Sequence, residues 1–386
     1  MLEILFLLLP IAAGYGWYMG RRSVRQKQTN QRKQLSRDYF TGLNFLLSNE
    51  SDKAVDLFIS MLDVDDDTID THLSLGSLFR KRGEVDRSIR IHQNLIARPS
   101  LTTEQRDIAM MELGKDYLAA GFYDRAEEIF INLVNQDDHS EESETQLIAI
   151  YQVTKDWQKA IDIIKKLKRK RQHELKHDSA HFYCELANEA EDDALKLKNL
   201  QLAIKQDSQC ARALLTLAEQ YLKQEEFKSC KQAIEKLLTT DIDLVPDALA
   251  IAKEAYLLTN DSTGYQELLR EAIEKGAGAS VTITLAQHMI EQGHPKDAEK
   301  LIMEGLIRHP TMKSFQHLMK MQLLQAEEGQ AKKSLSMLEQ LVEQQIKYRP
   351  GYRCRECGFP SHRLYWHCPS CKHWGSIKRI RGLDGE

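Results

Sequence analysis

Residues 114–134 read GKDYLAAGFYDRAEEIFINLV. Gly114 is followed by Tyr117 three residues later and by Gly121 seven residues later. Ala126 comes twelve residues after Gly114. Small residues occur where two helices must touch, and glycine tolerates the positive φ of a tight turn between helices. The pattern therefore predicts two packed helices joined by a turn at Gly121.

The same pattern recurs along the chain. Gly42 with Phe45, and Gly76 with Phe79, begin two earlier copies, and the starts are 34 and then 38 residues apart. Later copies start at spacings of 34, 36, 34, 34 and 34 residues, at Ile148, Cys184, Ala218, Ala252 and Ala286. A 34-residue helix–turn–helix period resembles the tetratricopeptide repeat. Residues 38–346 are therefore predicted to hold eight or nine such repeats.

A repeat of this kind cannot bury its apolar face alone, so stacked neighbours form one continuous core. The fold class expected is all-α, a tetratricopeptide-repeat solenoid. Stacking of this type leaves a concave surface that holds peptides or proteins. A purely structural spacer is the alternative.

The composition supports a helical body. The chain has 386 residues, only 8 Pro and 28% charged side chains, which excludes disordered, collagenous and multi-span membrane proteins. Its net charge of −4 is uneven, since residues 1–37 and 347–386 carry +6 each and the middle carries −16. An acidic body opposes binding to a polyanion, so no nucleic-acid partner is expected.

The N-terminal residues 4–20, ILFLLLPIAAGYGWYMG, contain no charge. Seventeen helical residues reach roughly 26 Å, slightly less than the hydrocarbon core of a bilayer. Seven Lys or Arg residues follow, in 21–37. The positive-inside rule then predicts a single transmembrane helix in 1–20, a basic juxtamembrane linker in 21–37 and a body in the cytoplasm. A cleaved signal peptide, with its charge before the apolar stretch, is the alternative.

Four cysteines near the C-terminus form two C-x2-C pairs separated by ten residues: Cys354, Cys357, Cys368 and Cys371. Two such turns complete a tetrahedral thiolate cage, so residues 347–386 are predicted to be a small metal-binding module. It looks like a rubredoxin-type or zinc-ribbon module, although Lys372 stands where many such turns have glycine. One ion, iron or zinc, is expected, in a structural role rather than in electron transfer, because four thiolates close the coordination shell.

Aromatic and basic residues surround these cysteines. The aromatic residues are expected to dock the module onto the last helices: Tyr352, Phe359, Tyr365, Trp366 and Trp374. The basic residues are expected to face the acidic repeats or an acidic partner: Arg349, Arg353, Arg355, Arg363, Lys372, Lys378, Arg379 and Arg381.

A second possible metal motif lies at residues 173–177, HELKH, with His181 four residues further on. The H-E-x-x-H pattern binds zinc in metalloproteases when both histidines share one helix. Here it falls at a predicted junction between helices, so we expect no catalytic residues. Cys184 and Cys230 occupy small-residue positions of the repeats, where a free thiol packs as a small apolar group.

The combination of an anchor, a repeat array and a ribbon that contains LYWHCPSC (364–371) and RGLDG (381–385) is similar to the lipopolysaccharide assembly protein B family of Gram-negative bacteria. The resemblance spans the whole chain. It implies a single-pass inner-membrane protein with its body on the cytoplasmic side. It also implies a non-enzymatic adaptor that promotes proteolysis of the deacetylase LpxC by the membrane protease FtsH.

The same resemblance implies further partners, namely an inner-membrane regulator that senses lipopolysaccharide and, as part of a scaffold, lipopolysaccharide transport proteins. A different class of function stays open beside it, an iron-binding redox or sensing module docked on the repeats. The residues do not decide between iron and zinc.

Overall fold

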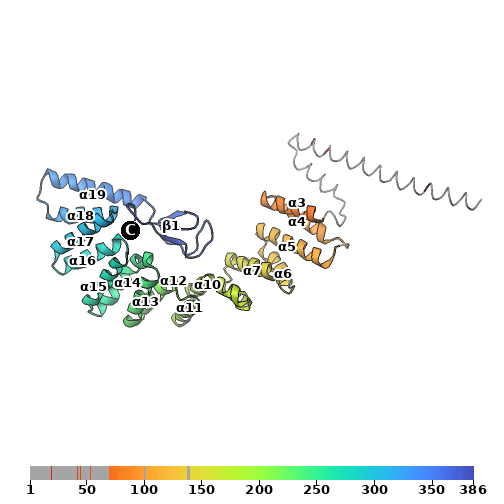
Figure 1. Cartoon of the computed structure of the whole chain (residues 1–386), viewed down its shortest axis with the longest axis horizontal. Coiled ribbons are helices and arrows are strands. Elements are labelled where there is room, and N and C mark those ends of the chain that lie inside the picture. Colours follow the sequence, from red (N-terminus) through yellow and green to blue (C-terminus); the bar gives the residue numbers. More distant parts are fainter. Residues whose placement is uncertain are drawn as a thin grey trace, which may run out of the picture. The chain divides into compact units, whose positions relative to one another are not determined.

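The computed structural model describes residues 69–99, 101–136 and 140–386, together with Met19, Thr41, Asn44 and Lys53 (Figure 1). Apart from Met19, the predicted membrane helix 1–20 and the linker 21–37 lie outside the described residues. Within the described part, no helix is both long and apolar enough to cross a bilayer. The chain divides into two compact units, Met1–Ile150 and Tyr151–Glu386.

The first unit consists of helix pairs. Its described helices are α3 (Ile69–Lys81), α4 (Val85–Ile96), α5 (Thr103–Ala119) and α6 (Tyr123–Val134), and α7 (Ser140–Thr154) runs across the boundary. α3 packs on α4 and α5 packs on α6, as the repeat pattern predicts. A Cβ on Gly114 would lie 2.7 Å from the ring of Phe130, so only glycine fits this contact. Gly121 has a φ of 78°, which confirms the predicted turn.

A buried polar network joins α3, α4 and α5. Asp116 is fully buried and accepts hydrogen bonds from Ser88 Oγ and Arg80 Nη1, both at 2.6 Å. Arg80 Nη2 also donates to Glu112, at 2.6 Å. Burial opposes ionisation of Glu112, but hydrogen bonds from Lys115 and Arg80 outweigh it and lower the pKa of Glu112 to about 2. Ionised side chains of this network, such as Arg80 and Glu112, therefore link two adjacent repeats.

The second unit also contains helix pairs. Its helices are α8 (Trp157–Lys166), α9 (Arg169–Glu174), α10 (Lys176–Glu189), α11 (Asp193–Gln206), α12 (Ala211–Lys223), α13 (Phe227–Thr240), the short η2 (Ile242–Leu244), α14 (Val245–Leu258), α15 (Ser262–Glu274), α16 (Ala279–Glu291), α17 (Pro295–Arg308), α18 (Met312–Gln325) and α19 (Gln330–Tyr348). From α10 on, each even-numbered helix packs on the odd-numbered helix that follows it and on the next even-numbered helix. Figure 1 shows them stacked in one row. This confirms an all-α repeat array.

One predicted register is wrong by a single residue. The turn after α14 has its positive φ at Asn260, eight residues after Ala252. In the preceding copy it falls at Glu225, seven residues after the start. Tyr265, which is buried, therefore fills the contact position that the spacing gives to Gly264. The spacing of the starts hides this shift because Ala252 itself is small and buried, and the extra residue lies between Ala252 and the turn.

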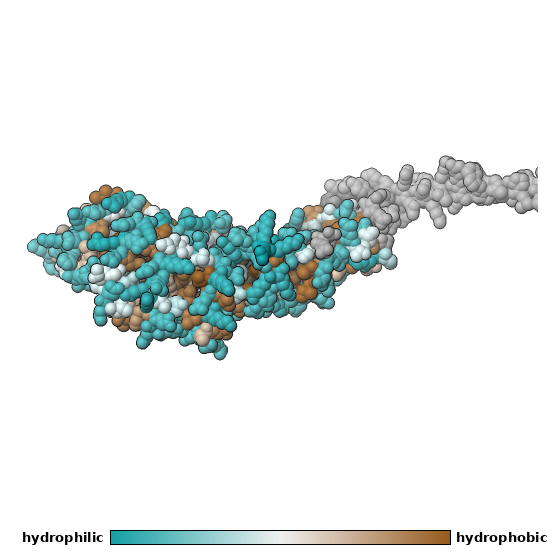
Figure 2. Space-filling model, turned by 60° about the horizontal axis from the view of Figure 1, so that its bottom comes forward, coloured by the Kyte–Doolittle hydropathy of each residue, from teal (hydrophilic) through white to brown (hydrophobic). Residues whose placement is uncertain are grey.

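The C-terminal module is a small antiparallel sheet. Its strands are β1 (Tyr352–Cys354), β2 (Pro360–Ser361) and β3 (Ile377–Arg379), in the order β2-β1-β3. Tyr352 is opposite Ser361 on one side and Arg379 on the other. The module lies on the inner side of the row of even-numbered helices (Figure 1). The face drawn in Figure 2 is mostly hydrophilic, with hydrophobic residues in small, separate patches.

Candidate metal centre

Two turns of the same design carry the four predicted cysteines. In the first turn, which follows β1, the N–H of Gly358 donates to the carbonyl of Cys354 at 3.0 Å. In the second turn, the N–H of Lys372 donates to the carbonyl of Cys368, also at 3.0 Å. Each turn therefore points the two sulfurs of its C-x2-C pair toward the other turn.

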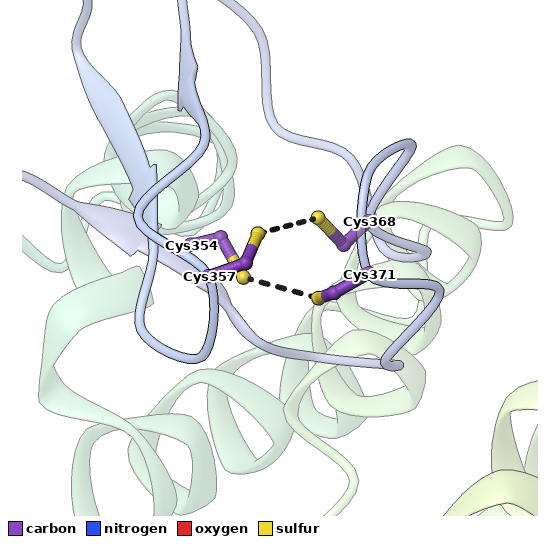
Figure 3. Close-up of side chains that lie close together, drawn as sticks. All are labelled: Cys354, Cys357, Cys368 and Cys371. Carbon is purple, nitrogen blue, oxygen red and sulfur yellow. Dashed lines mark hydrogen bonds between the residues drawn. The ribbon is translucent and has the colours of Figure 1, made fainter.

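The four sulfurs converge on one point between the turns (Figure 3). Cys354 Sγ lies 3.7 Å from Cys371 Sγ, and Cys357 Sγ lies 3.7 Å from Cys368 Sγ. All four sulfurs are within 4.8 Å of one another. A metal about 2.3 Å from each of four sulfurs in a tetrahedron places neighbouring sulfurs about 3.8 Å apart. The cage therefore fits a single metal ion, and the four cysteines form a rubredoxin-like or zinc-ribbon metal site.

Backbone conformation explains the residue that follows each pair. Gly358 has a φ of 77° and Lys372 has a φ of 62°. Both turns thus use the left-handed region, which glycine adopts freely and lysine adopts at a cost of about 1 kcal/mol. Lys372 departs from the usual sequence pattern but not from the usual turn. Its side chain is exposed.

The electrostatics of the cage favour a cation. Burial opposes ionisation of Cys354, but Ser376 and backbone N–H groups of the first turn lower the pKa of Cys354 to about 6. The N–H of His373 favours the thiolate of Cys371, but burial and the three neighbouring sulfurs raise the pKa of Cys371 to about 12. Four thiolates this close repel one another unless a positive ion lies among them.

The ligand set also indicates what the ion supplies. Four thiolates fill a tetrahedral shell and leave no position for water or substrate, as in structural sites. When bound, the ion would fix both turns and contribute the folding energy of a module that has little apolar core. Iron and zinc both fit four cysteine ligands, so this geometry does not select between them.

Three aspartates of the second unit receive the basic residues of the module. Asp241, Asp243 and Asp247 lie at η2 and the start of α14. Lys378 pairs with Asp241, and Arg379 pairs with Asp247 at 2.6 Å. Arg355 and Arg381 both pair with Asp243. The prediction that these basic residues face the acidic repeats is confirmed for four of them.

The last residue of the chain adds a second polar contact. The side chain of Glu386 accepts hydrogen bonds from the backbone N–H of Ser280 at 2.8 Å and from Lys313 Nζ at 2.6 Å. Arg379 Nη1 also donates to this carboxylate, at 2.9 Å. These charges hold the pKa of Glu386 below its usual value although burial opposes ionisation. The side chain of Glu386 therefore links the module to α16 and α18.

An aromatic cluster makes the apolar part of the contact. The ring of Trp374 stacks on His181 of α10 with centroids 5.1 Å apart, and its other neighbours include His367 at 4.4 Å. Trp157 of α8 meets Trp374 edge to face at 6.0 Å. Arg212 of α12 lies over the ring of Trp366. The module thus covers helices from α8 to α18, not only the last helices as the sequence predicts.

The five predicted docking aromatics have different roles. Tyr352, Trp366 and Trp374 contact the repeats. Phe359 packs against the core of the module itself, and Tyr365 is exposed. Aromatic composition alone could not separate these roles, because only Tyr352 lies in a strand and the other four lie in the connecting segments, whose course depends on the folded module.

Comparison with known proteins agrees with this architecture. Residues 352–379 match the family model of the rubredoxin metal binding domain, and residues 71–105 match that of a tetratricopeptide repeat. Lipopolysaccharide assembly protein B of Escherichia coli K12 is 45% identical over 388 residues, and the alignment covers 100% of both chains. The protein of the same name from Haemophilus influenzae is 39% identical over 394 residues, again with 100% of both chains covered.

The chain belongs to the lipopolysaccharide assembly protein B family. Among solved structures, a tetratricopeptide repeat protein from Parabacteroides merdae aligns with 71% of this chain and 99% of its own, at 10% identity and a TM-score of 0.33. Family membership rests on the two full-length relatives.

The HELKH stretch of this family member does not form a metal site. His173 and Glu174 end α9, whereas His177 lies on α10, so the motif spans a helix junction as predicted. His177 Nδ1 lies 3.1 Å from Asp207, and His173 is exposed. Among the described residues, the four cysteines are the only His, Cys, Asp or Glu group whose geometry suits a metal ion.

The other cysteines are buried. Cys184, Cys210 and Cys230 each have at most 1% of their surface exposed. Contact with Cys210, together with burial, raises the pKa of Cys184 well above its ordinary value, and burial raises the pKa of Cys230 to about 11. Neutral thiols pack as small apolar groups, which agrees with the core role predicted for Cys184 and Cys230.

Proposed function

We propose that this chain is a non-enzymatic inner-membrane adaptor in the control of lipopolysaccharide biosynthesis, which presents the deacetylase LpxC to the membrane protease FtsH. The relatives are named for lipopolysaccharide assembly, and they align along their whole length. One observation of the chain itself carries the proposal. The metal module has a closed thiolate shell and is docked into the repeat array, as expected of a binding platform rather than a reaction centre.

Tethering is the physical basis of the proposed mechanism. A membrane helix in residues 1–20, with the body on the cytoplasmic side, would raise the local concentration of the repeats beside a membrane protease. A repeat array offers an extended surface for a protein partner. Degradation would then require no chemistry from this chain, only simultaneous contact with enzyme and substrate.

Further partners belong to the same proposal. An inner-membrane regulator that senses lipopolysaccharide would oppose the adaptor, and lipopolysaccharide transport proteins would use it as a scaffold. The first contact would involve the membrane helix and the second would involve the repeats. Both contacts are expected to be protein–protein contacts without nucleic acid.

The decisive experiment measures the half-life of LpxC after protein synthesis is blocked. Cells would carry the intact chain, no chain, or a chain that lacks residues 1–20. We expect LpxC to persist several-fold longer in the second and third cases. A Cys354→Ser/Cys371→Ser variant should behave like the absent chain, while the exposed His362→Ala should behave like the intact one. An unchanged half-life without the chain would reject the adaptor role.

A second candidate is electron transfer or sensing by bound iron. The observation that favours it is the exposure of Cys357, which puts one ligand of the cage at the surface. Metal analysis and the visible absorption of the purified chain distinguish the two candidates. A colourless zinc protein with full adaptor activity would exclude the redox role, whereas a coloured iron protein whose activity follows its oxidation state would support it.

A further inference from the structure

Residues 165–176, KKLKRKRQHELK, form a basic segment in an otherwise acidic part of the chain. It contains seven Lys or Arg residues and a single acid, Glu174, whereas residues 38–346 as a whole carry −16. Such a concentration of one charge is not needed for the repeat fold. The helices before and after it keep their contacts through apolar residues such as Ile161 and Phe182.

The structure places this segment outside the regular helix pairs. The six-residue α9 is an extra helix that packs against α8 and α10. None of its residues is buried. The side chains of Lys166, Lys168, Arg169 and Lys170 are exposed and can therefore reach a partner.

Local hydrogen bonds hold the segment in place. Gln172 Nε2 donates to the carbonyl of Lys165 at 2.8 Å and to the carbonyl of Leu167 at 2.9 Å. Leu167 is itself buried. The cations are thus presented by an ordered turn, and binding would lose little conformational entropy of the backbone.

Few negative charges of the chain compensate these cations. Lys165 lies 3.6 Å from Asp162, and both side chains are more than half exposed, so solvent screens this pair. Within the described part of the chain, Lys166, Lys168, Arg169 and Lys170 form no ion pair. At least four cations of the segment therefore remain for an external anion.

We propose that the basic segment binds the anionic phospholipid surface of the membrane in which the chain is anchored. This inference rests on the proposed function, because the predicted anchor is what keeps the body beside that surface. Each Lys or Arg near an anionic bilayer strengthens the attraction about fivefold, and the anchor supplies a high local concentration. Acidic charges of the body that lie more than about 8 Å from α9 are screened at physiological salt, so they weaken a contact at α9 only slightly.

Other partners fit the segment less well. Protein interfaces are depleted in lysine and centred on buried aromatic or apolar groups, whereas this segment exposes mainly lysine and arginine. Nucleic acid would have to reach the same cations without the benefit of the anchor. A lipid contact at α9 would fix the orientation of residues 151–386 against the bilayer, where the anchor alone would leave them free to rotate.

Hydrogen–deuterium exchange of the full chain in nanodiscs tests this contact. Nanodiscs of phosphatidylcholine alone are compared with nanodiscs that also contain phosphatidylglycerol. We expect the amides of 165–176 to exchange at least about fivefold more slowly with the anionic lipid, and this protection to vanish at roughly 0.5 M NaCl because the Debye length falls. Protection should also be lost in the variant Lys168→Gln/Arg169→Gln/Lys170→Gln.

A control variant removes the same charge elsewhere. Three exposed cations of α17 serve this purpose: Lys296→Gln, Lys300→Gln and Arg308→Gln. The variant with these three substitutions should retain the lipid-dependent protection of the amides of residues 165–176. Equal exchange in both lipids, or equal loss of protection in both variants, would overturn the lipid contact. Protection by a duplex oligonucleotide but not by phosphatidylglycerol would assign the segment to nucleic acid.

The two proposals fail in different ways. If the half-life of LpxC depends on the chain but hydrogen–deuterium exchange at 165–176 is the same with and without phosphatidylglycerol, the lipid contact alone is rejected. If exchange responds to the lipid while LpxC half-life does not depend on the chain, the adaptor function is rejected and the lipid contact remains.

Discussion

Arg379 holds Asp247 through two parallel hydrogen bonds, from Nη2 to Oδ1 at 2.6 Å and from Nε to Oδ2 at 2.9 Å. Tyr352 Oη donates to the same Oδ1, also at 2.6 Å. Two-pronged pairs of this kind are among the stronger hydrogen bonds in proteins and fix orientation as well as distance. One aspartate of α14 therefore sets the position of two strands of the metal module.

Replacement of this aspartate should loosen the module. Asp247→Ala leaves Tyr352 without its acceptor and Arg379 with Glu386 alone in a poorly solvated contact, and we expect docking to weaken by about 2–4 kcal/mol. Hydrogen exchange of the amides in β1 and β3 measures this change. Asp297→Ala removes an equally charged but exposed side chain and should leave those amides unaffected. Equal protection in both variants would contradict the assigned role of Asp247.

Removal of the metal should release the module while the helices stay folded. The ion would contribute on the order of 10–16 kcal/mol to a module with little core of its own, whereas the helices have separate apolar cores. Chelation is expected to shift tryptophan fluorescence to the red, because Trp366 and Trp374 leave their contacts, with little change in far-ultraviolet circular dichroism. The Cys354→Ser/Cys371→Ser variant should already show the shifted spectrum. An unshifted spectrum of the metal-free chain would show that docking does not need the ion.

Gly358 and Lys372 both have a positive φ, and substitutions at these two positions should change the stability of the module in opposite directions. Lys372→Gly removes the conformational cost of a positive φ and should stabilise the module against chelation by up to about 1 kcal/mol. Gly358→Ala introduces that cost and should destabilise it by about the same amount. Chelator titration of each variant gives the comparison. Destabilisation by Lys372→Gly would mean that the lysine side chain contributes a contact.

Acid should weaken the network of the first unit. The pKa of Glu112 is lowered to about 2 from an ordinary value near 4.5, so its ionised form stabilises the folded state above pH 4.5. That contribution, on the order of 2–3 kcal/mol, is lost as the pH falls toward 2. Urea unfolding of wild type and Glu112→Gln should therefore differ most above about pH 5 and converge in acid. If the difference in unfolding free energy between wild type and Glu112→Gln does not change with pH, the charge of the carboxylate is not the source of the stabilisation.

Two histidines of the second unit should behave differently. His173 is exposed at the end of α9, so His173→Ala should change neither stability nor adaptor activity. His181 is buried against Trp374, so His181→Ala opens a cavity in the docking contact and should cost about 1–3 kcal/mol. Thermal unfolding and LpxC half-life are the two readouts. Loss of function in a stable His173→Ala protein would revive the protease interpretation.

Much of this structure follows from short-range patterns in the sequence. Gly114 and Gly121 predict a helix contact and a turn because each feature depends on residues a few positions apart. The spacing of Cys354 and Cys357 predicts a metal turn for the same reason. Periodicity then extends the first prediction to a whole array, since every copy repeats the same local rule.

The positions at which the module docks onto the repeats could not be predicted from short-range sequence patterns. Asp241, Asp243 and Asp247 are three aspartates in a loop and a helix start, and nothing near them in sequence indicates four basic partners more than a hundred residues away. The sequence signals for docking are indirect: an acidic body followed by a basic end, and aromatic residues around the cysteines. The one-residue shift after Ala252 has a local cause, since α14 runs one residue further beyond Ala252 than α12 runs beyond Ala218, and the spacing of the starts does not reveal this difference.

The reach of the module from Trp157 on α8 to Lys313 on α18 has a mechanical consequence. In an open array each repeat touches only its neighbours, so small rotations add up and the array bends like a spring. Here repeats far apart in sequence contact the same small sheet, and the sheet acts as a brace that restrains their movement relative to one another within residues 151–386. Stretching the array would have to break aromatic and ionic contacts at several helices together. The four cysteines that fold the sheet would thereby set the stiffness of a much larger body.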